Sequence, residues 1–230
     1  MTEFASGSTI LVDKPLGWTS FDVVNKIRWN LKQKLGVKKI KVGHAGTLDP
    51  LATGLLVICI GKHTKLINEI MPGEKTYTGK ILLGKTTPSY DLETEYDQEY
   101  STDHITSELI ERARVSFLGE QDQVPPIFSA KQVDGKRAYD IARAGGEVEL
   151  KANSVHISDF SINDRAFPEI SFEVSCSKGT YIRSIAFDFG RKLNSGGTLT
   201  ELRRTRSGDY SIDDCKTVDE WIEIIQNSSL

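Results

Sequence analysis

The chain has 230 residues, of which 38% are hydrophobic and 27% charged, and its formal net charge is −3. This composition is typical of a globular protein with a substantial core and excludes a disordered chain. The longest apolar run, residues 55–60, is too short to span a bilayer, and the first residues form no basic-then-apolar leader. We therefore expect a cytoplasmic protein with no membrane association.

The first third of the chain predicts a strand, a helix and a second buried element. Residues 10–15 are typical of a short strand that ends in a turn. Thr19 or Ser20 is a suitable cap for a helix that continues to about residue 34. Residues 55–60 form either a buried strand or the start of a short helix, because periodicity alone does not separate the two. The expected apolar stripe of the helix consists of Phe21, Val24, Ile27 and Leu31.

The remaining elements alternate without a regular βαβ pattern. We expect strands at 76–83, 155–162 and 170–177, and helices at 107–117, 138–144, 180–193 and 219–226. Consecutive prolines at 125 and 126 predict an extended loop over 124–130. This mixture predicts a single α+β domain over 1–230, with a mixed, mostly antiparallel central sheet flanked by helices and loops.

Charge is distributed unevenly along the chain. Residues 23–48 contain no acid but seven lysines and arginines, whereas 86–111 contain eight acids and no lysine or arginine. Further basic groups lie at 131–143 and 203–206. Such segregation predicts a basic face that attracts phosphates, although ordinary solvated helix faces would give the same local pattern.

The segment from Gly43 to Leu56 places one carboxylate, Asp49, in a turn rich in glycine. Pro50 biases the residue before it away from helical geometry and has no N–H to donate. Three glycines in this segment permit tight backbone paths and close approach to a ligand. The pattern indicates a functional loop that presents Asp49.

This segment closely resembles the signature of the TruB-type pseudouridine synthases, RNA enzymes whose catalytic aspartate stands at the Asp49 position. The resemblance implies the pseudouridine-synthase fold and a catalytic role for Asp49. A carboxylate serves such a reaction either as a nucleophile or by acting on the sugar to assist departure of the base. The sequence leaves both routes open.

Further motifs extend the resemblance to most of the chain. In the segment 178–184, Arg183 matches the family arginine that pairs with the aspartate, and Tyr181 matches a residue that lines the uracil pocket. Tyr77 matches a family tyrosine suited to stack on the flipped uracil, and it is also a candidate for accepting the C5 proton. We therefore expect Asp49, Arg183 and Tyr77 to form the catalytic set.

The resemblance also implies substrate-binding residues outside this set. His44 matches the histidine that contacts the extruded nucleotide, and we expect it to pack or hydrogen-bond rather than act as acid or base. Leu202 matches a pocket residue, and the three arginines after it would meet phosphates or remain solvated. Lys14, in an Asp-Lys-Pro motif, is expected at the substrate site as a support of the catalytic loop.

Two features differ from the family pattern. Pro88 and Thr94 replace residues that are often Asp and Gly around Asp91, so we assign Asp91 a supporting role at most. Many relatives carry a C-terminal RNA-binding domain of the PUA type, whereas the extension 209–230 is too short for one. An insertion at about 121–152, including Phe128, Lys136 and Tyr139, resembles the family's RNA-gripping segment.

The resemblance implies isomerisation of uridine 55 in the tRNA T arm, after base flipping, by a monomer that needs no protein partner. No metal or cofactor is expected, since neither metal-ligand spacing nor a nucleotide-binding fingerprint occurs. Three widely spaced cysteines are expected to be reduced thiols.

Two alternative functions are a guide-RNA-dependent synthase of the box H/ACA type and a non-catalytic tRNA chaperone. A glycosidase is remote, because no pair of positioned carboxylates is evident.

Overall fold

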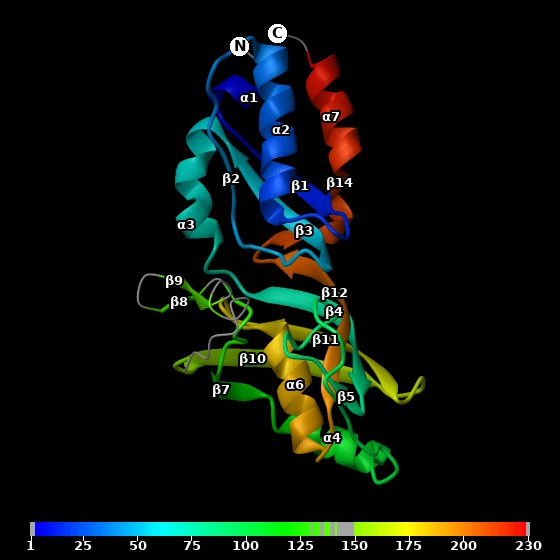
Figure 1. The fold of residues 1–230 in the computed structure, drawn as a ribbon. Coiled ribbons are helices and arrows are strands. Elements are labelled where there is room, and N and C mark those ends of the chain that lie inside the picture. Colours follow the sequence, from blue (N-terminus) through cyan, green and yellow to red (C-terminus); the bar gives the residue numbers. More distant parts are fainter. Residues whose placement is uncertain (1–2, 130, 134–135, 139–140, 142–149, 229–230) are drawn as a thin grey trace. The chain divides into compact units, whose positions relative to one another are not determined.

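A computed structural model describes residues 3–129, 131–133, 136–138, 141 and 150–228 (Figure 1). The chain divides into two compact units, 1–77 with 202–230 and 78–201. Two long strands, β4 (Lys75–Leu83) and β12 (Gly197–Ser207), each begin in one unit and end in the other. The predicted 138–144 helix falls largely outside the described residues.

The first unit is built on strands in the order β14-β1-β3-β12. β1 (Ser8–Lys14) and β3 (Ala52–Ile60) are antiparallel, whereas β12 runs parallel to β3 and β14 (Lys216–Thr217) runs parallel to β1. Two short strands, β2 (Val42–His44) and β13 (Tyr210–Ser211), extend β3 and β12. The open alternative for 55–60 is therefore resolved as a strand.

Two helices of the first unit lie side by side, α2 (Ser20–Leu35) and α7 (Val218–Asn227) (Figure 1). Lys34 Nζ of α2 donates to Gln226 O of α7 at 2.7 Å. Both helices begin with a capping box, at Thr19 and Thr217, in which the cap hydroxyl and the third residue's carboxylate satisfy free backbone N–H groups. Shorter helical segments complete this unit, namely α1 (Glu3–Ser6), η1 (Gly61–Leu66), α3 (Ile67–Ile70) and η2 (Ile212–Asp214).

The predicted stripe of α2 was wrong at one position. Val24, Ile27 and Leu31 are buried as expected, but Phe21 is 61% exposed and Val23 takes its place in the core. Because Val23 and Ile27 stand four residues apart, they share a face with Val24 and Leu31, and Phe21 lies on the other side of the helix.

The second unit contains strands in the order β4-β11-β10-β7, and β10 is antiparallel to both of its neighbours. Its core holds an aromatic cluster in which Phe160 lies about edge-on to Phe117, Phe172 and Phe189, with ring centroids 6.0 to 6.1 Å apart. Such edge-to-face packing is the favoured geometry of aromatic pairs. The elements are β5 (Lys85–Thr86), β6 (Gln98–Glu99), α4 (Ser107–Val115), β7 (Gly119–Gln123), β8 (Gln132–Val133), β9 (Lys136–Arg137), β10 (Asn153–Asn163), β11 (Glu169–Cys176) and α6 (Ile182–Lys192).

The α+β prediction is confirmed, as are the strands and helices that lie within the described residues. The largest omission is β12, whose three arginines resemble a surface segment although the strand is mostly buried. In the part of the chain that the structure describes, no helix is both long and apolar enough to cross a membrane.

Gly54 illustrates how closely β12 packs on β3. Its φ is +101°, and a Cβ added there would lie 2.3 Å from Arg204 O. We expect Gly54→Ala to lower the free energy of unfolding by about 3 kcal/mol or more, since backbone strain and a clash combine. Gly36→Ala is the matched control, with φ +63° and open space around its Cβ. It should lose only about 1 kcal/mol. Equal losses in urea unfolding would contradict this account of Gly54.

Candidate active site

The signature loop lies in the first unit, between β2 and β3. β2 pairs with the far end of β3 in the register Val42–Ile60, so the chain turns back on itself between His44 and Ala52. Gly46 turns with a φ of +103°, in the left-handed region that glycine adopts without steric penalty. Asp49 is half-buried, and its carbonyl accepts a hydrogen bond from Ala52 N at 3.1 Å.

The backbone is fixed on both sides of Asp49. Leu48 N donates to Ser20 Oγ at 2.8 Å, and Ser20 Oγ donates to Leu48 O at 3.0 Å. Pro50 O accepts from Gly17 N at 2.8 Å. Three separate backbone atoms next to Asp49 are therefore held by the segment that contains the start of α2.

Arg204 of β12 holds the rest of the loop. Its side chain is 1% exposed, and its guanidinium donates to Leu55 O at 2.8 Å, Gly46 O at 3.1 Å and Thr47 O at 3.5 Å. The planar fork of an arginine suits several carbonyls at fixed angles, and each such charge-assisted bond is stronger than a neutral one. Arg204 thus joins both ends of the loop to one strand.

Two of the arginines after Leu202 form contacts within the chain. Arg203 forms a two-bond ion pair with Asp13, at 3.0 and 2.7 Å, and its contact with a phosphate stays a prediction. Arg204 is buried, so the expectation of phosphate or solvent contact was wrong for Arg204. The alternation of β12 explains it, because Leu202 and Arg204 share its buried face.

Lys14 is the second buried cation of the loop. It has no exposed surface, and its Nζ donates to Trp18 O at 2.6 Å, Pro15 O at 3.0 Å and Pro50 O at 3.4 Å. Burial lowers the pKa of Lys14 to about 8, against the opposing attraction of Asp49 and Asp22. This geometry agrees with loop support, while contact with a substrate stays a prediction.

His44, at the end of β2, lies beside the same loop. Burial lowers its pKa below the ordinary value for histidine, and the charge of Arg204 lowers it further. A neutral imidazole is thereby favoured at neutral pH, which fits packing or hydrogen bonding better than ionic contact. Tyr77 and Leu202 also belong to this unit, and both side chains are buried.

Arg183 lies in the second unit, in the first turn of α6. Its Nε is 3.6 Å from Asp91 Oδ2, and the side chains are 6% and 8% exposed. Nη1 also donates to Ser89 O at 3.4 Å. Asp91 in turn is fixed, because its carbonyl accepts from Thr87 Oγ1 at 2.7 Å and its Oδ1 accepts from Glu93 N at 3.0 Å. Asp91 is therefore placed to orient Arg183, and its supporting role in the reaction stays a prediction.

Tyr181 immediately precedes α6, and one side chain fixes its backbone. Its N–H donates to Gln123 Oε1 at 2.7 Å, and its carbonyl accepts from Gln123 Nε2 at 3.1 Å. Sequence reasoning missed Gln123, since a single glutamine at the end of β7 carries no local signal. The prediction that Arg183 pairs with Asp49 stays a prediction, because the two residues belong to different units.

The insertion at 121–152 is described only in part. Residues 124–129 form neither helix nor strand, as expected, and β8 pairs with β9 in the register Gln132–Arg137. Among the described residues, no three His, Cys, Asp or Glu side chains gather into a metal-binding group. All three cysteines are free thiols. The positions Ala130, Gly135 and Tyr139 of the insertion motif lie outside the described residues.

Comparison with known proteins decides the family. A model of the TruB family pseudouridylate synthase (N terminal domain) matches residues 32–182. The chain belongs to the TruB family. Proteins named tRNA pseudouridine synthase B are similar over nearly its whole length, with 56% identity in Phocaeicola vulgatus and 53% in Flavobacterium johnsoniae. These matches cover 96% and 97% of this chain, and 95% and 98% of the relatives.

Solved structures show the fold. A Cbf5–Nop10–Gar1 complex contains a chain with 27% identity and a TM-score of 0.71, over 96% of this chain and 54% of that one. An H/ACA ribonucleoprotein bound to a substrate RNA that contains 2′-deoxyuridine matches with 25% identity and a TM-score of 0.68. The second match covers 96% of this chain and 53% of that one. The expected pseudouridine-synthase fold is confirmed. In this TruB-family chain, the signature loop at Asp49 is therefore the candidate catalytic centre.

The depressed pKa of Lys14 predicts a pH dependence of stability. The folded chain releases this proton near pH 8, whereas the unfolded chain keeps it to about pH 10.5. Unfolding therefore takes up a proton between these values, and raising the pH stabilises the fold. The free energy of unfolding of the wild type should rise from pH 8 to 10.5 relative to Lys14→Met.

Urea unfolding at several pH values measures this difference, with Lys216→Met as the control for an exposed lysine. The control should keep a constant offset from the wild type. A difference between wild type and Lys14→Met that stays flat from pH 7 to 10.5 would show that Lys14 remains protonated throughout.

Proposed function

We propose that this chain converts uridine to pseudouridine at position 55 in the T arm of tRNA, with Asp49 as the reacting carboxylate. Family membership and the names of relatives that share more than half of their residues with it support the tRNA substrate. The observation that carries the proposal is the fixed backbone around Asp49, since a catalytic group must be held in one geometry.

The proposed reaction uses the carboxylate of Asp49 and no cofactor. The C1′–N1 bond breaks, the uracil turns, C1′ joins to C5, the C5 proton leaves, and N1 gains a proton. Asp49 would take part either by attacking the sugar or by removing a proton from it, so that the glycosidic electrons depart with the base. Asp49 is half-buried, and the reaction requires its carboxylate to reach a flipped nucleotide.

The other predicted residues have roles that depend on this placement. Arg183, oriented by Asp91, would hold the Asp49 carboxylate ionised when the two side chains meet. Tyr77 would stack on the flipped uracil and is the candidate acceptor of the C5 proton. We assign the walls of the uracil pocket to His44, Tyr181 and Leu202.

We infer that the enzyme acts in the cytoplasm as a monomer, on tRNA alone. The H/ACA ribonucleoprotein bound to a substrate RNA contains a chain at 25% identity, whereas proteins named tRNA pseudouridine synthase B reach 56%. This difference favours the guide-independent enzyme. Purified chain should therefore form pseudouridine 55 on an unmodified tRNA transcript with no added protein or RNA. Product that appears only with a guide RNA would assign the chain to the other class.

Replacing Asp49 with asparagine tests the chemical role. Asp49→Asn keeps the size and removes the charge, so pseudouridine formation should fall by about 10³-fold or more. The affinity for tRNA should change little. Asp219→Asn, an exposed acid on α7, is the matched control and should behave as wild type.

Three outcomes distinguish catalysis from other roles of Asp49. Loss of product with binding kept supports catalysis by Asp49. Loss of binding in proportion to activity would contradict a purely chemical role. Absence of product from the wild type, with tRNA binding intact, would favour a chaperone.

A further inference from the structure

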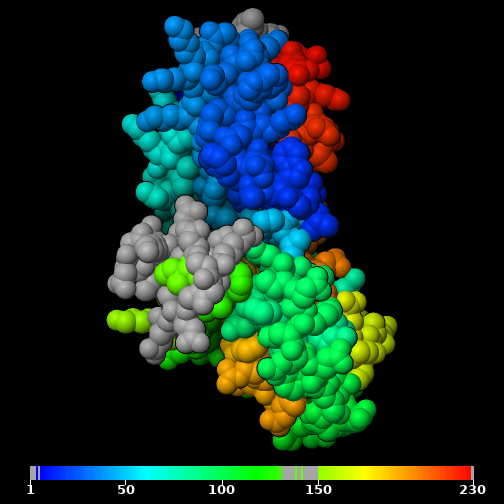
Figure 2. All heavy atoms as spheres, in the orientation of Figure 1, coloured from blue at the N-terminus to red at the C-terminus, as the bar shows by residue number. Residues whose placement is uncertain are grey.

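The outer side of α2 carries two large aromatic side chains that the core does not use. Phe21 is 61% exposed and Trp29 is 58% exposed. They stand eight residues apart, about two helical turns, with exposed Asn25 between them. The three residues therefore lie on one face. Figure 2 shows atoms of α2, in blue, at the visible surface of the first unit, with α7 in red along its edge.

Most charges around this face are positive, and the exposed acid Asp22 is bonded to Thr19 in the capping box. Lys26, Lys38, Lys39 and Lys41 are exposed, and no acid occurs between Asp22 and Asp49. Arg28 is fixed among them, since it donates to Asn25 Oδ1 at 2.8 Å and to Val42 O at 2.9 Å.

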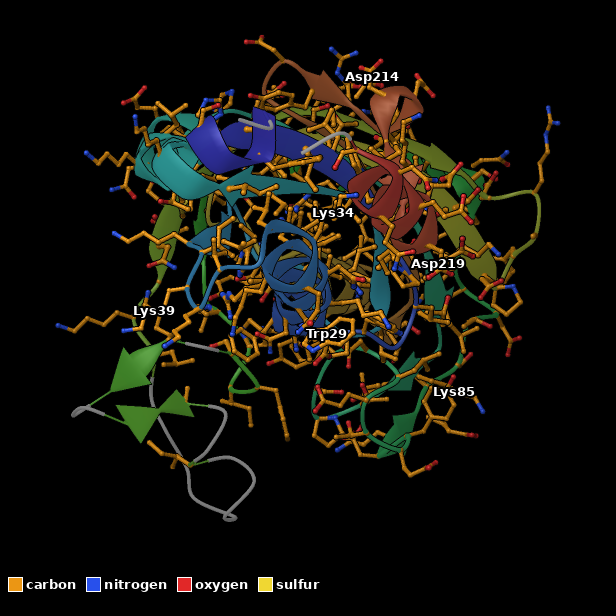
Figure 3. All side chains as sticks on the ribbon, turned by 90° about the horizontal axis from the view of Figure 1, so that it is seen from above. Trp29, Lys34, Lys39, Lys85, Asp214 and Asp219 are labelled. Atoms are coloured by element: carbon orange, nitrogen blue, oxygen red, sulfur yellow. The ribbon has the colours of Figure 1, made fainter. Side chains whose placement is uncertain are left out.

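Five exposed acids of the same unit form a separate flank. In Figure 3, Asp214 and Asp219 lie on the flank away from Lys39, and Trp29 lies on the outer side of α2. Lys34 is directed to α7, where it bonds Gln226 O, and so does not belong to the basic face. Basic and acidic residues of the first unit are therefore concentrated on different sides. Its acidic flank is formed by the exposed residues Asp213, Asp214, Asp219, Glu220 and Glu223.

This face begins beside the signature loop. Ser20, the first residue of α2, exchanges two hydrogen bonds with Leu48, next to Asp49. From there α2 rises about 1.5 Å per residue, so Trp29 stands about 13 Å along the helix and the far end about 24 Å along it. A ligand that covers both the loop and this face must be much longer than one nucleotide.

We propose that the outer face of α2, with Phe21, Asn25, Trp29 and the lysines Lys26, Lys38 and Lys39, binds the tRNA outside the nucleotide that reacts. The lysines neutralise backbone phosphates, and Trp29 stacks on a base or ribose that is not inside a duplex. This inference rests on the proposed function for the identity of the RNA. A lysine-rich face next to exposed aromatic rings is complementary to a polyanion with flat bases.

Binding of a full-length tRNA transcript, measured over a range of salt concentrations, tests this surface. Trp29→Ala should weaken binding at least about fivefold, because it removes a stacking partner, and should leave the salt dependence unchanged. Trp29→Tyr should restore most of the affinity. Combined Lys38→Gln and Lys39→Gln should weaken binding and lower the slope of log affinity against log salt by about 0.7 to 0.9 for each phosphate that is no longer neutralised.

Two controls carry matched changes at exposed residues that do not belong to this face. Lys216→Gln neutralises a lysine next to the acidic flank, and Tyr96→Ala removes an exposed aromatic ring in the second unit. Both should bind tRNA as the wild type does. Steady-state kinetics should show that the α2 variants raise KM while kcat at saturating tRNA stays within about twofold, since the reacting nucleotide is held elsewhere.

The result that would overturn the proposal is a set of α2 variants whose affinity and salt slope equal those of the controls. A wild-type dimer in sedimentation that is lost in Trp29→Ala, with tRNA binding unchanged, would instead assign the face to a second copy. Failure of the proposed function is distinguishable, since it appears as a wild type that binds tRNA and forms no pseudouridine.

Discussion

The buried guanidinium of Arg204 is the interaction on which the candidate site depends. A charge with 1% exposure is unfavourable unless its donors are satisfied, and here they meet carbonyls at positions 46, 47 and 55. These carbonyls lie on both sides of Asp49, so one side chain fixes the entry and the exit of the loop. Gly54 permits the close approach, because a side chain there would collide with the backbone of Arg204.

A second buried cation completes the support. Lys14 ends β1 and satisfies carbonyls of its own turn and of Pro50, so the loop is held from β1 and β12, the two strands that flank β3. The chain therefore uses cations to organise backbone, and leaves the carboxylate of Asp49 as the acidic group presented by the loop. In the second unit a buried carboxylate has the organising role, since Asp91 orients the cation Arg183.

Much of this arrangement could be predicted from the sequence, and the failures have physical causes. The signature of glycines, Asp49 and Pro50 was sufficient to locate the loop, because the glycines permit backbone conformations that other residues avoid and Pro50 restricts the residue before it. Periodicity placed most helices and strands, but it placed Phe21 in the core, since an exposed aromatic ring and a buried one look alike in a pattern.

The arginines of β12 were the harder case. Three of them in four residues resemble a solvated segment, and only the pairing of β12 with β3 shows that Arg204 turns inward while Arg203 meets Asp13. The role of Gln123 could not be predicted from the sequence for a similar reason, because it depends on a partner 58 residues away. Contacts between distant segments leave no local signature, so a sequence read without a structure misses them.

Hydrogen exchange and turnover of Arg204→Lys, compared with the wild type, test the central claim most directly. A lysine keeps the charge but not the fork, so it cannot hold three carbonyls in the same geometry. Amides of residues 46–55 should exchange faster while those of β10 and β11 do not change. Pseudouridine formation should fall by about 10²-fold, as expected for a misplaced catalytic group, with tRNA affinity nearly unchanged. Wild-type exchange and wild-type turnover in this variant would contradict the account.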